Sequence, residues 1–235
     1  MSAPSVNNRD DRAGRLPWRP AAIFFDLDGT LADTAADLAA PVNAMREQRG
    51  LAPLPLAQLR PFSSAGARGL IGAGLGIDRD HESFEELKND FLARYEAAMC
   101  VHTRLFDGLG PMLDTLDERG IVWGVVSNKV ERYVRPILAD LGILHRSASA
   151  IGGDTTGHAK PHPEPLLHAA RLVRVEPQRC IYVGDDERDI EAGRAAGMLT
   201  IAAAYGFCGD ARPPALWGAD HLVDTPQALA ALLTA

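Results

Sequence analysis

The sequence predicts an α/β fold in which a doubly wound, Rossmann-like parallel sheet carries an inserted helical cap domain. Two observations support this. Short apolar runs alternate with helical stretches over most of the chain, and one long gap between the first two runs holds helical patterns only. Alternating strands and helices form a parallel sheet that is covered on both faces. The 235 residues suffice for one such core and a modest insertion.

Short apolar runs bounded by turn residues are typical of buried strands. They predict strands at 21–26, 121–127, 148–152, 180–184 and 199–204, with an edge strand at 221–223. Apolar residues at helical spacing between and after these runs predict helices at 108–119, 130–141, 163–174, 187–196 and 226–234.

Residues 34–106 are expected to form the cap, since they hold helical patterns near 34–49, 56–60, 66–75 and 82–99 and no good strand. The core is then 21–33 and 107–235. Hinges are expected near 32–36 and 105–110. Residues 1–20 mix Arg, Asp, Asn and Pro without an apolar segment, so we expect a disordered leader and no secretory signal.

Two aspartates, Asp26 and Asp28, directly follow the first predicted strand. Being two residues apart, they start on the same side of it, at the edge where open α/β sheets bind ligands. Carboxylates this close repel each other unless a cation shares them, which indicates a divalent metal and phosphate chemistry. A calcium-binding loop fits less well, because loop position 12, counted from Asp26, is Asp37 instead of a glutamate.

Three later segments carry polar residues at comparable places. Ser127 and Asn128 end the second predicted strand, Lys160 precedes a proline-rich helix start, and an acidic turn from Asp185 to Asp189 ends the fourth strand. Each segment alone is common, as a strand end, a surface lysine or a helix N-cap. In this order the four segments resemble the motifs of the haloacid dehalogenase superfamily in its phosphatase form, over nearly the whole chain after residue 20.

The resemblance implies catalytic roles for these residues. Asp26 would be the nucleophile that forms an aspartyl-phosphate, and Asp28 would protonate the leaving group and then activate water. Thr30 would position Asp28. Ser127 and the backbone amide of Asn128 would hold phosphoryl oxygens, while Lys160 would neutralise charge on the phosphate and on Asp26.

The resemblance also implies Mg²⁺ as the cofactor, because this ion prefers oxygen ligands and keeps several waters. Its ligands would be the Asp26 carboxylate, the Asp28 backbone carbonyl and Asp185. Asp189 or Asp186 would orient the metal-bound waters from nearby.

Within the superfamily the resemblance is closest to bacterial phosphoglycolate phosphatases, which implies hydrolysis of 2-phosphoglycolate. The turn after Asp185 and the late segment 217–221 also resemble a sister group that acts on N-acetylmuramic acid 6-phosphate, which remains the alternative. Both substrates carry a carboxylate. Arg68 is the candidate to bind it, because it follows the loop 63–66, which in this family faces the phosphate, and arginine binds carboxylates bidentately.

Two further readings stay open. A phosphosugar mutase of the same architecture would return the phosphoryl group to a second hydroxyl. A non-catalytic protein on this fold would be expected to lack one of Asp26, Asp28, Lys160 or Asp185, and all four are present.

A glycine-rich run, Gly69–Gly76, could be mistaken for a dinucleotide-binding loop. That fingerprint requires a preceding strand inside a βαβ unit. Here polar residues precede the run and helical patterns flank it, so we expect close helix packing or a flexible cap edge instead.

The formal net charge of −7 and a pI near 5.5 argue against binding to nucleic acid or an anionic membrane. No apolar run approaches the ~20 residues of a membrane span. Cys100, Cys180 and Cys208 are scattered, which predicts reduced thiols in a cytoplasmic protein. The expected partner is a small phosphate ester, and the expected state is a monomer or a weak homodimer.

Overall fold

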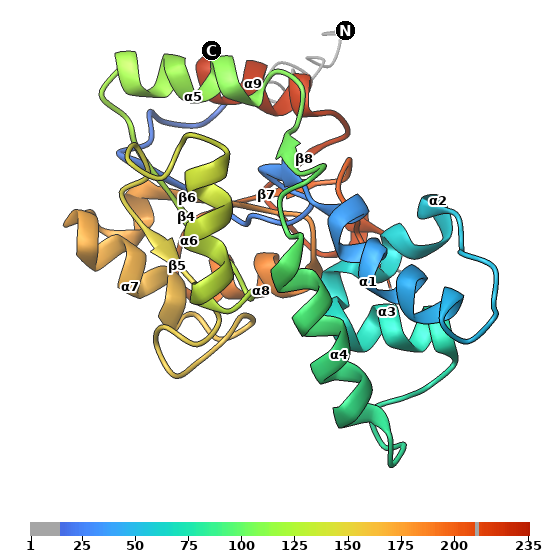
Figure 1. Cartoon of the computed structure of the whole chain (residues 1–235). Helices are drawn as coiled ribbons and strands as arrows, with labels where there is room; N and C mark the ends of the chain where they lie inside the picture. Colours follow the sequence, from blue (N-terminus) through green and yellow to red (C-terminus); the bar gives the residue numbers. More distant parts are fainter. Residues whose placement is uncertain (1–14, 210–211) are drawn as a thin grey trace, which may run out of the picture.

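The computed structural model describes residues 15–209 and 212–235, and its core is a six-stranded sheet in the order β5-β4-β1-β6-β7-β8 (Figure 1). Every neighbouring pair in this sheet is parallel. The α/β class and all six predicted strands are therefore confirmed. Their bounds are β1 (Ala22–Phe25), β4 (Val122–Val126), β5 (Ala150–Ile151), β6 (Cys180–Gly184), β7 (Leu199–Ala203) and β8 (His221–Val223).

Strand β1 lies in the middle of the sheet, and its four residues are fully buried. Ile23 and Phe25 pack in one hydrophobic cluster with α5 (Leu109–Glu118), α6 (Glu131–Asp140) and α9 (Pro226–Thr234). Ala22 and Phe24 point to the other face, where α7 (Glu164–Val173) and α8 (Glu187–Ala195) cover them. Because successive strand residues face opposite sides, this apolar strand requires helices on both faces.

The chain adds β4 and β5 on one side of β1 and β6, β7 and β8 on the other. Strand order therefore reverses at β1. Open α/β sheets bind ligands outside the carboxyl ends of the strands at such a switch point.

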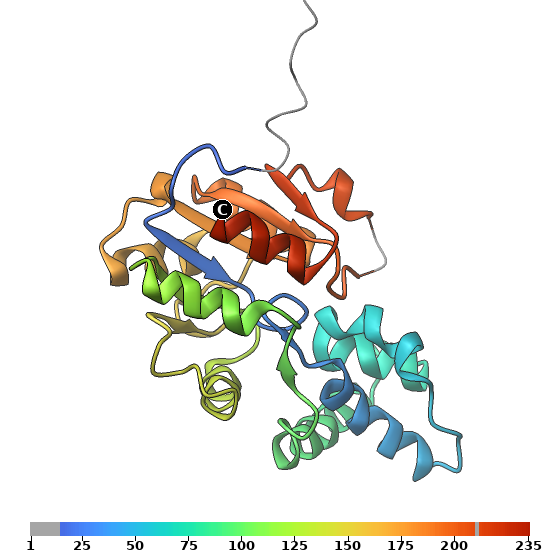
Figure 2. The same ribbon diagram turned by 90° about the horizontal axis from the view of Figure 1, so that it is seen from above.

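The cap consists of four helices, which Figure 2 shows lying beside the core. They are α1 (Ala35–Glu47), α2 (Leu56–Leu59), α3 (Gly66–Leu75) and α4 (Phe84–Ala97), with a 3₁₀ helix at Arg60–Ala65 between α2 and α3. The cap has a hydrophobic cluster of its own, to which the core contributes Tyr133 and Phe207.

A short antiparallel ribbon joins the two parts, where the sequence predicted no strand. Strand β2 (Ala32–Asp33) pairs with β3 (Arg104–Leu105) at the two expected hinge regions. Strands of two residues leave no periodic pattern in the sequence, so the ribbon could not be predicted. The Asp37 carboxylate reinforces this crossing by accepting hydrogen bonds from the backbone N–H groups of His102 and Thr103.

The glycine-rich run lies in α3, which packs on α1. A Cβ atom at Gly74 would lie 2.3 Å from Cγ2 of Val42, so only glycine allows this close helix contact. The interpretation as helix packing is confirmed.

The prediction of a disordered leader is wrong for residues 15–20. Leu16 and Trp18 pack against the core, and Nη2 of Arg19 donates to the backbone oxygen of Arg119 at 2.6 Å. The remainder of the predicted leader, 1–14, lies outside the described residues.

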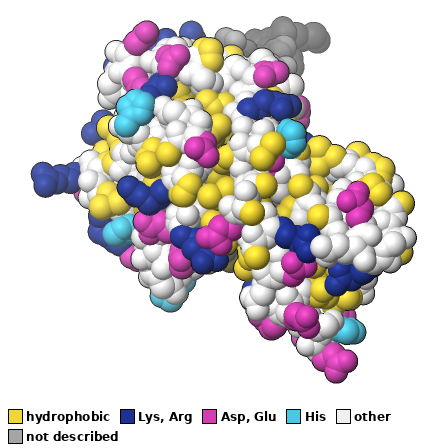
Figure 3. Space-filling view, in the orientation of Figure 1, with side chains coloured by type: hydrophobic (Ala, Val, Ile, Leu, Met, Phe, Trp, Pro, Cys, Tyr) yellow, Lys and Arg dark blue, Asp and Glu magenta, His cyan; other side chains and the backbone are white. Residues whose placement is uncertain are grey.

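On the face that Figure 3 shows, acidic and basic side chains are interspersed and form no continuous basic area. Among the helices of residues 15–209 and 212–235, none combines the length and the apolar character needed to span a bilayer.

Candidate active site

The predicted site residues converge at the carboxyl ends of the central strands. Asp26 directly follows β1, Ser127 follows β4 and Asp185 follows β6. A cavity of about 580 Å³ lies between this edge of the sheet and the cap. Core and cap both line it, the core with Asp26, Asp28, Ser127, Asn128, Lys129, Lys160, Arg188 and Asp189, and the cap with Leu38, Ser63, Ser64, Phe91, Leu92 and Tyr95.

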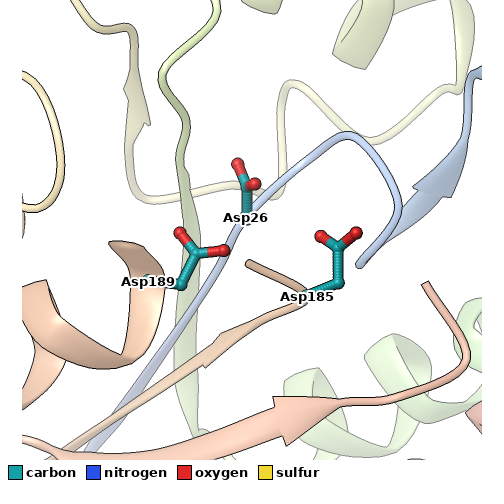
Figure 4. Close-up of side chains that lie close together, drawn as sticks. All are labelled: Asp26, Asp185 and Asp189. Atoms are coloured by element: carbon teal, nitrogen blue, oxygen red, sulfur yellow. The ribbon is translucent and has the colours of Figure 1, made fainter. Parts of the chain in front are cut away.

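Three buried carboxylates lie together at the base of the site. Asp26, Asp185 and Asp189 each offer an oxygen, and these oxygens lie within 4.8 Å of one another. Figure 4 shows the three carboxyl groups directed toward the same space. Asp186 is placed differently, because its carboxylate caps α8 and forms an ion pair with Arg188 at 2.7 Å. Asp186 and Asp189 were the two candidates to orient metal-bound waters, and only Asp189 lies in the cluster.

Lys160 supplies the positive charge at this cluster. Its Nζ lies 2.7 Å from Oδ1 of Asp189 and 3.1 Å from Oδ1 of Asp26. It also contacts the Tyr182 hydroxyl at 2.7 Å and the backbone oxygen of Val126 at 3.1 Å. Burial opposes the charge, but the two carboxylates outweigh it and raise the pKa of Lys160. The side chain is therefore a fixed ammonium.

The cluster fits a divalent cation on its charge and its donor atoms. Three carboxylates face one ammonium, which leaves an excess of two negative charges. Burial and the neighbouring carboxylates raise the pKa of Asp185 well above its ordinary value. Burial likewise raises the pKa of Asp189 to about 7, with Lys160 opposing the shift and Asp26 adding to it. Such crowding is relieved by a hard cation, and carboxylate oxygens are the ligands Mg²⁺ prefers.

The fold holds Asp185 rigidly. Its Oδ1 accepts from the Thr30 hydroxyl at 2.7 Å, and its Oδ2 accepts from the Phe207 backbone N–H at 2.8 Å. Gly29 has φ +83°, and a Cβ atom there would lie 2.2 Å from Asp185 Oδ2. The glycine in the first motif is thus needed for both its backbone conformation and its close approach to this carboxylate.

Asp189 is oriented by the start of α8. Its Oδ2 accepts from the backbone N–H of Asp186, while the Asp186 side chain accepts from Arg188, which completes a capping box. This arrangement satisfies backbone N–H groups at the helix start and fixes the Asp189 carboxylate beside Lys160.

Asp28 also lines the cavity and is held by Thr34. The Thr34 hydroxyl donates to Oδ1 of Asp28 at 2.6 Å, whereas Thr30 bonds Asp185. The prediction that Thr30 positions Asp28 is therefore wrong. Thr30 is also fully buried and outside the cavity lining, so it does not contact a substrate there. Thr34 lies six positions after Asp28 along the chain, and the turn at Gly29 brings them together.

We expect Thr34→Val to lower kcat/KM, which reports the steps up to departure of the leaving group, about tenfold for esters with poor leaving groups, the value of one charge-assisted hydrogen bond. The substitution keeps the shape but releases Asp28. Nitrophenyl phosphate, whose leaving group needs no proton, should be affected much less. Comparing kcat/KM for the two kinds of ester in the variant measures this, and equal losses on both would contradict a role in positioning the acid.

Ser127 and Asn128 both line the cavity, and Ser127 is buried. The Asn128 side chain has a further task. Its amide group donates to the backbone oxygen of Lys160 at 2.9 Å and its Oδ1 accepts from the Lys160 backbone N–H at 2.8 Å. Asn128 thereby ties the end of β4 to the segment that carries the ammonium.

The structure does not bring Arg68 to the site. Arg68 lies in the first turn of α3 with its side chain exposed, and it is absent from the residues that line the cavity. The preceding loop, Ser63 to Gly66, does line it. Arg68 is therefore not placed to clamp a substrate carboxylate in this arrangement.

Lys129 was missed by the sequence analysis. Its Nζ lies 3.1 Å from Oδ2 of Asp28 and 3.0 Å from the hydroxyl of Tyr95 on the cap helix α4. Burial opposes its charge, but Asp28 and Tyr95 outweigh this effect and raise the pKa of Lys129. One signal could have pointed to it: the whole chain has only three lysines, Lys88, Lys129 and Lys160, and two of them are buried here.

Together these groups place two carboxylates, Asp26 and Asp28, a buried ammonium and an acidic cluster that fits a cation around one cavity. Both contacts to Asp26, from the Leu27 N–H and from Lys160, are to Oδ1. Within the described residues, Oδ2 has no such partner and is available for attack on an electrophile in the cavity.

Comparisons with known proteins agree with this geometry. The model of the haloacid dehalogenase-like hydrolase family matches residues 23–203. A phosphoglycolate phosphatase of Xanthomonas campestris is 48% identical over 210 residues, covering 89% of this chain and 95% of that protein. An N-acetylmuramic acid 6-phosphate phosphatase of Pseudomonas aeruginosa is 42% identical over 211 residues, covering 90% and 93%.

Among solved structures, a predicted phosphoglycolate phosphatase from Haemophilus somnus superposes with a TM-score of 0.76 at 28% identity. The superposition covers 87% of this chain and 94% of that chain. The fold thus recurs in a protein that is similar over nearly its whole length. The chain belongs to the haloacid dehalogenase-like hydrolases.

Proposed function

We propose that this protein is a Mg²⁺-dependent phosphatase that hydrolyses a small phosphate monoester through a phosphorylated Asp26. The observation that carries the proposal is the grouping of Asp26, Asp185 and Asp189 around one buried ammonium, with a second carboxylate, Asp28, nearby. Hydrolysis of a phosphate monoester is extremely slow without catalysis and requires a nucleophile, charge neutralisation and a proton donor. This site supplies each of them.

The chain's own residues perform distinct tasks in this mechanism. Asp26 attacks the phosphorus through Oδ2, and Lys160 balances the charge that accumulates on the transferring oxygens. Ser127 and Asn128 hold the phosphoryl group from the end of β4. Asp28, fixed by Thr34, protonates the departing oxygen and then takes a proton from the water that hydrolyses the aspartyl-phosphate.

Asp26, the Asp28 backbone carbonyl and Asp185 would hold the Mg²⁺, with Asp189 orienting its waters. The bound ion would supply electrostatic stabilisation of the phosphoryl oxygens. Closure of the cap over the cavity excludes bulk water from this chemistry.

The first candidate substrate is 2-phosphoglycolate, in line with the relative in X. campestris. The size of the cavity favours a second candidate, N-acetylmuramic acid 6-phosphate. At about 580 Å³ the cavity falls in the range that holds drug-sized ligands, and a two-carbon acid would fill a small part of it. Its wall also includes Phe91, Leu92 and Tyr133, apolar surfaces suited to a sugar ring.

The test is phosphate release from both esters side by side, with Mg²⁺ and with EDTA. The proposal expects metal-dependent hydrolysis and a clear preference in kcat/KM for one ester. Analysis of the products tests the hypothesis that the protein is a mutase, because a mutase would yield a rearranged sugar phosphate instead of free phosphate. A folded, Mg²⁺-loaded protein that hydrolyses no phosphate ester would overturn the proposal.

A further inference from the structure

The exclusion of Arg68 leaves open which cation recognises an acidic leaving group. The cavity lining contains five cationic side chains. Lys160 is occupied by four partners at the phosphate end. Arg188 is bound to both oxygens of Asp186 and to the backbone oxygen of Ser64. Lys88 pairs with Glu85 and its side chain is 40% exposed, and Arg132 is exposed.

Lys129 is more buried than Lys88, Arg132 and Arg188, and it has fewer hydrogen-bond and ion-pair partners than Lys160. Only 8% of its side chain is exposed, yet it lines the cavity. Its contacts are to Asp28 and Tyr95, with its ammonium also 4.8 Å from the centre of the Tyr95 ring. An ammonium has three N–H donors, so one remains for a ligand.

The place of Lys129 defines which part of a ligand it meets. Asp28, the acid, must reach the oxygen that links phosphorus to the leaving group. Lys129 is the next side chain beyond Asp28: its Nζ lies 3.1 Å from Oδ2 of Asp28, and it also contacts Tyr95 of the cap. Its free donor therefore faces the leaving group and not the phosphoryl group, which Lys160 meets.

Two further polar groups on the cap lack partners. The hydroxyl oxygens of Ser63 and Ser64 are buried and have no hydrogen-bond partner within the described residues. Buried polar atoms without a partner are costly, and both residues line this cavity. A polar ligand in the cavity that supplies the missing hydrogen bonds would explain why these two hydroxyls are buried there.

We propose that Lys129 is the specificity-determining residue of this enzyme, and that it binds the carboxylate of the leaving group with help from the hydroxyls of Ser63 and Ser64. The inference rests on the proposed function. Because Tyr95 belongs to the cap, the same contact ties recognition of the acid to the position of the cap over the site.

The test compares esters with and without the carboxylate: 2-phosphoglycolate against ethyl phosphate, and N-acetylmuramic acid 6-phosphate against N-acetylglucosamine 6-phosphate, which lacks the lactyl arm that bears it. The measured quantity is the ratio of kcat/KM within each pair. Changes in acid–base chemistry caused by a substitution affect both members of a pair, so they largely cancel in this ratio.

For the preferred pair, Lys129→Met should lower the ratio about 10- to 100-fold, the range of one hydrogen bond between charged groups. Lys129→Arg should retain part of the preference. Lys88→Met, the same exchange at an exposed lysine of the same cavity, should leave the ratio unchanged. Tyr95→Phe serves if Lys129→Met does not fold, and it should raise KM for the carboxylate-bearing ester more than for its neutral counterpart.

An unchanged ratio in folded Lys129→Met, or an equal fall in Lys88→Met, would overturn the inference while the phosphatase function stands. In Tyr95→Phe, equal changes in KM for both members of the pair would do the same. Wild-type protein that hydrolyses other phosphate esters but none of these four would also overturn the inference, whereas hydrolysis of no phosphate ester at all would overturn the proposed function.

Discussion

Asp26→Asn is expected to lower kcat by about 10⁴-fold or more on every substrate, the scale of losing a nucleophile that acts as part of a unit. An amide cannot attack phosphorus to form the acyl phosphate. The substitution also removes one of the two carboxylates that hold the Lys160 ammonium. Steady-state phosphate release under saturating substrate and Mg²⁺ measures the loss.

Asp186→Asn is the matched control for this prediction. Asp186 lines the same cavity, but its carboxylate caps α8 and pairs with Arg188, and asparagine also caps helices well. This variant should keep activity within about tenfold of wild type, since the partly buried Asp186–Arg188 pair lies outside the group of Asp26, Asp185 and Asp189. Comparable losses in the two variants would mean that removal of any negative charge from the cavity wall, and not loss of the nucleophile, accounts for the effect.

Asp185→Asn is expected to have opposite effects on activity and on stability. Activity should fall by several orders of magnitude, because the metal cluster loses a ligand that provides electrostatic stabilisation. The metal-free protein should instead become more stable, with Tm higher by about 2–4 °C for each kcal/mol gained in a domain of this size. An asparagine can still accept from the Phe207 N–H and donate to the Thr30 hydroxyl, the two groups that hold Asp185.

The direction of this change in stability follows from the pKa of Asp185. Burial, with Asp26 and Asp189 adding to it, raises this pKa in the folded protein, so the folded state binds a proton that the unfolded state releases. The carboxyl therefore favours the folded state at low pH, and that contribution is lost as the pH rises through the folded pKa. The gain in Tm of Asp185→Asn without metal should be larger at pH 8 than at pH 5.

Adding Mg²⁺ should reverse the order of stability. The ion binds the folded wild type and raises its Tm, while the variant responds weakly. Thermal unfolding with EDTA and with Mg²⁺ at the two pH values provides the measurement. A variant that is no more stable than wild type in EDTA at pH 8 would contradict the view that the triad is an electrostatically strained cation site.

Much of the fold could be predicted because its strands are buried on both faces and read as continuous apolar runs. The run at Ala22–Phe25 is an example: it is apolar throughout because both sides are buried, and its short length and the turn residues that follow identify it as a strand. The β2–β3 ribbon could not be predicted, since two-residue strands at a crossing are set by the hinge and not by side-chain periodicity.

The sequence showed which strand ends carry the polar groups of the site. It did not show which hydrogen bonds these groups form. Thr30 and Thr34 follow the same turn, and only the path of the backbone around Gly29 decides which hydroxyl meets Asp28. Arg68 depended on the orientation of α3, which the loop before it does not determine. Lys129 was passed over because lysines are usually solvated, and its burial depends on the cap helix that supplies Tyr95.

The central claim, phosphorylation of Asp26, is tested most directly in the Asp28→Asn variant with p-nitrophenyl phosphate. This leaving group needs no proton, so the first step proceeds, while hydrolysis of the aspartyl-phosphate lacks its base. We expect a rapid burst of nitrophenolate equal to one equivalent of enzyme, and a phosphoryl group on the peptide containing Asp26 after acid quench. Linear release without a burst, or a phosphoryl group on another residue, would contradict the mechanism.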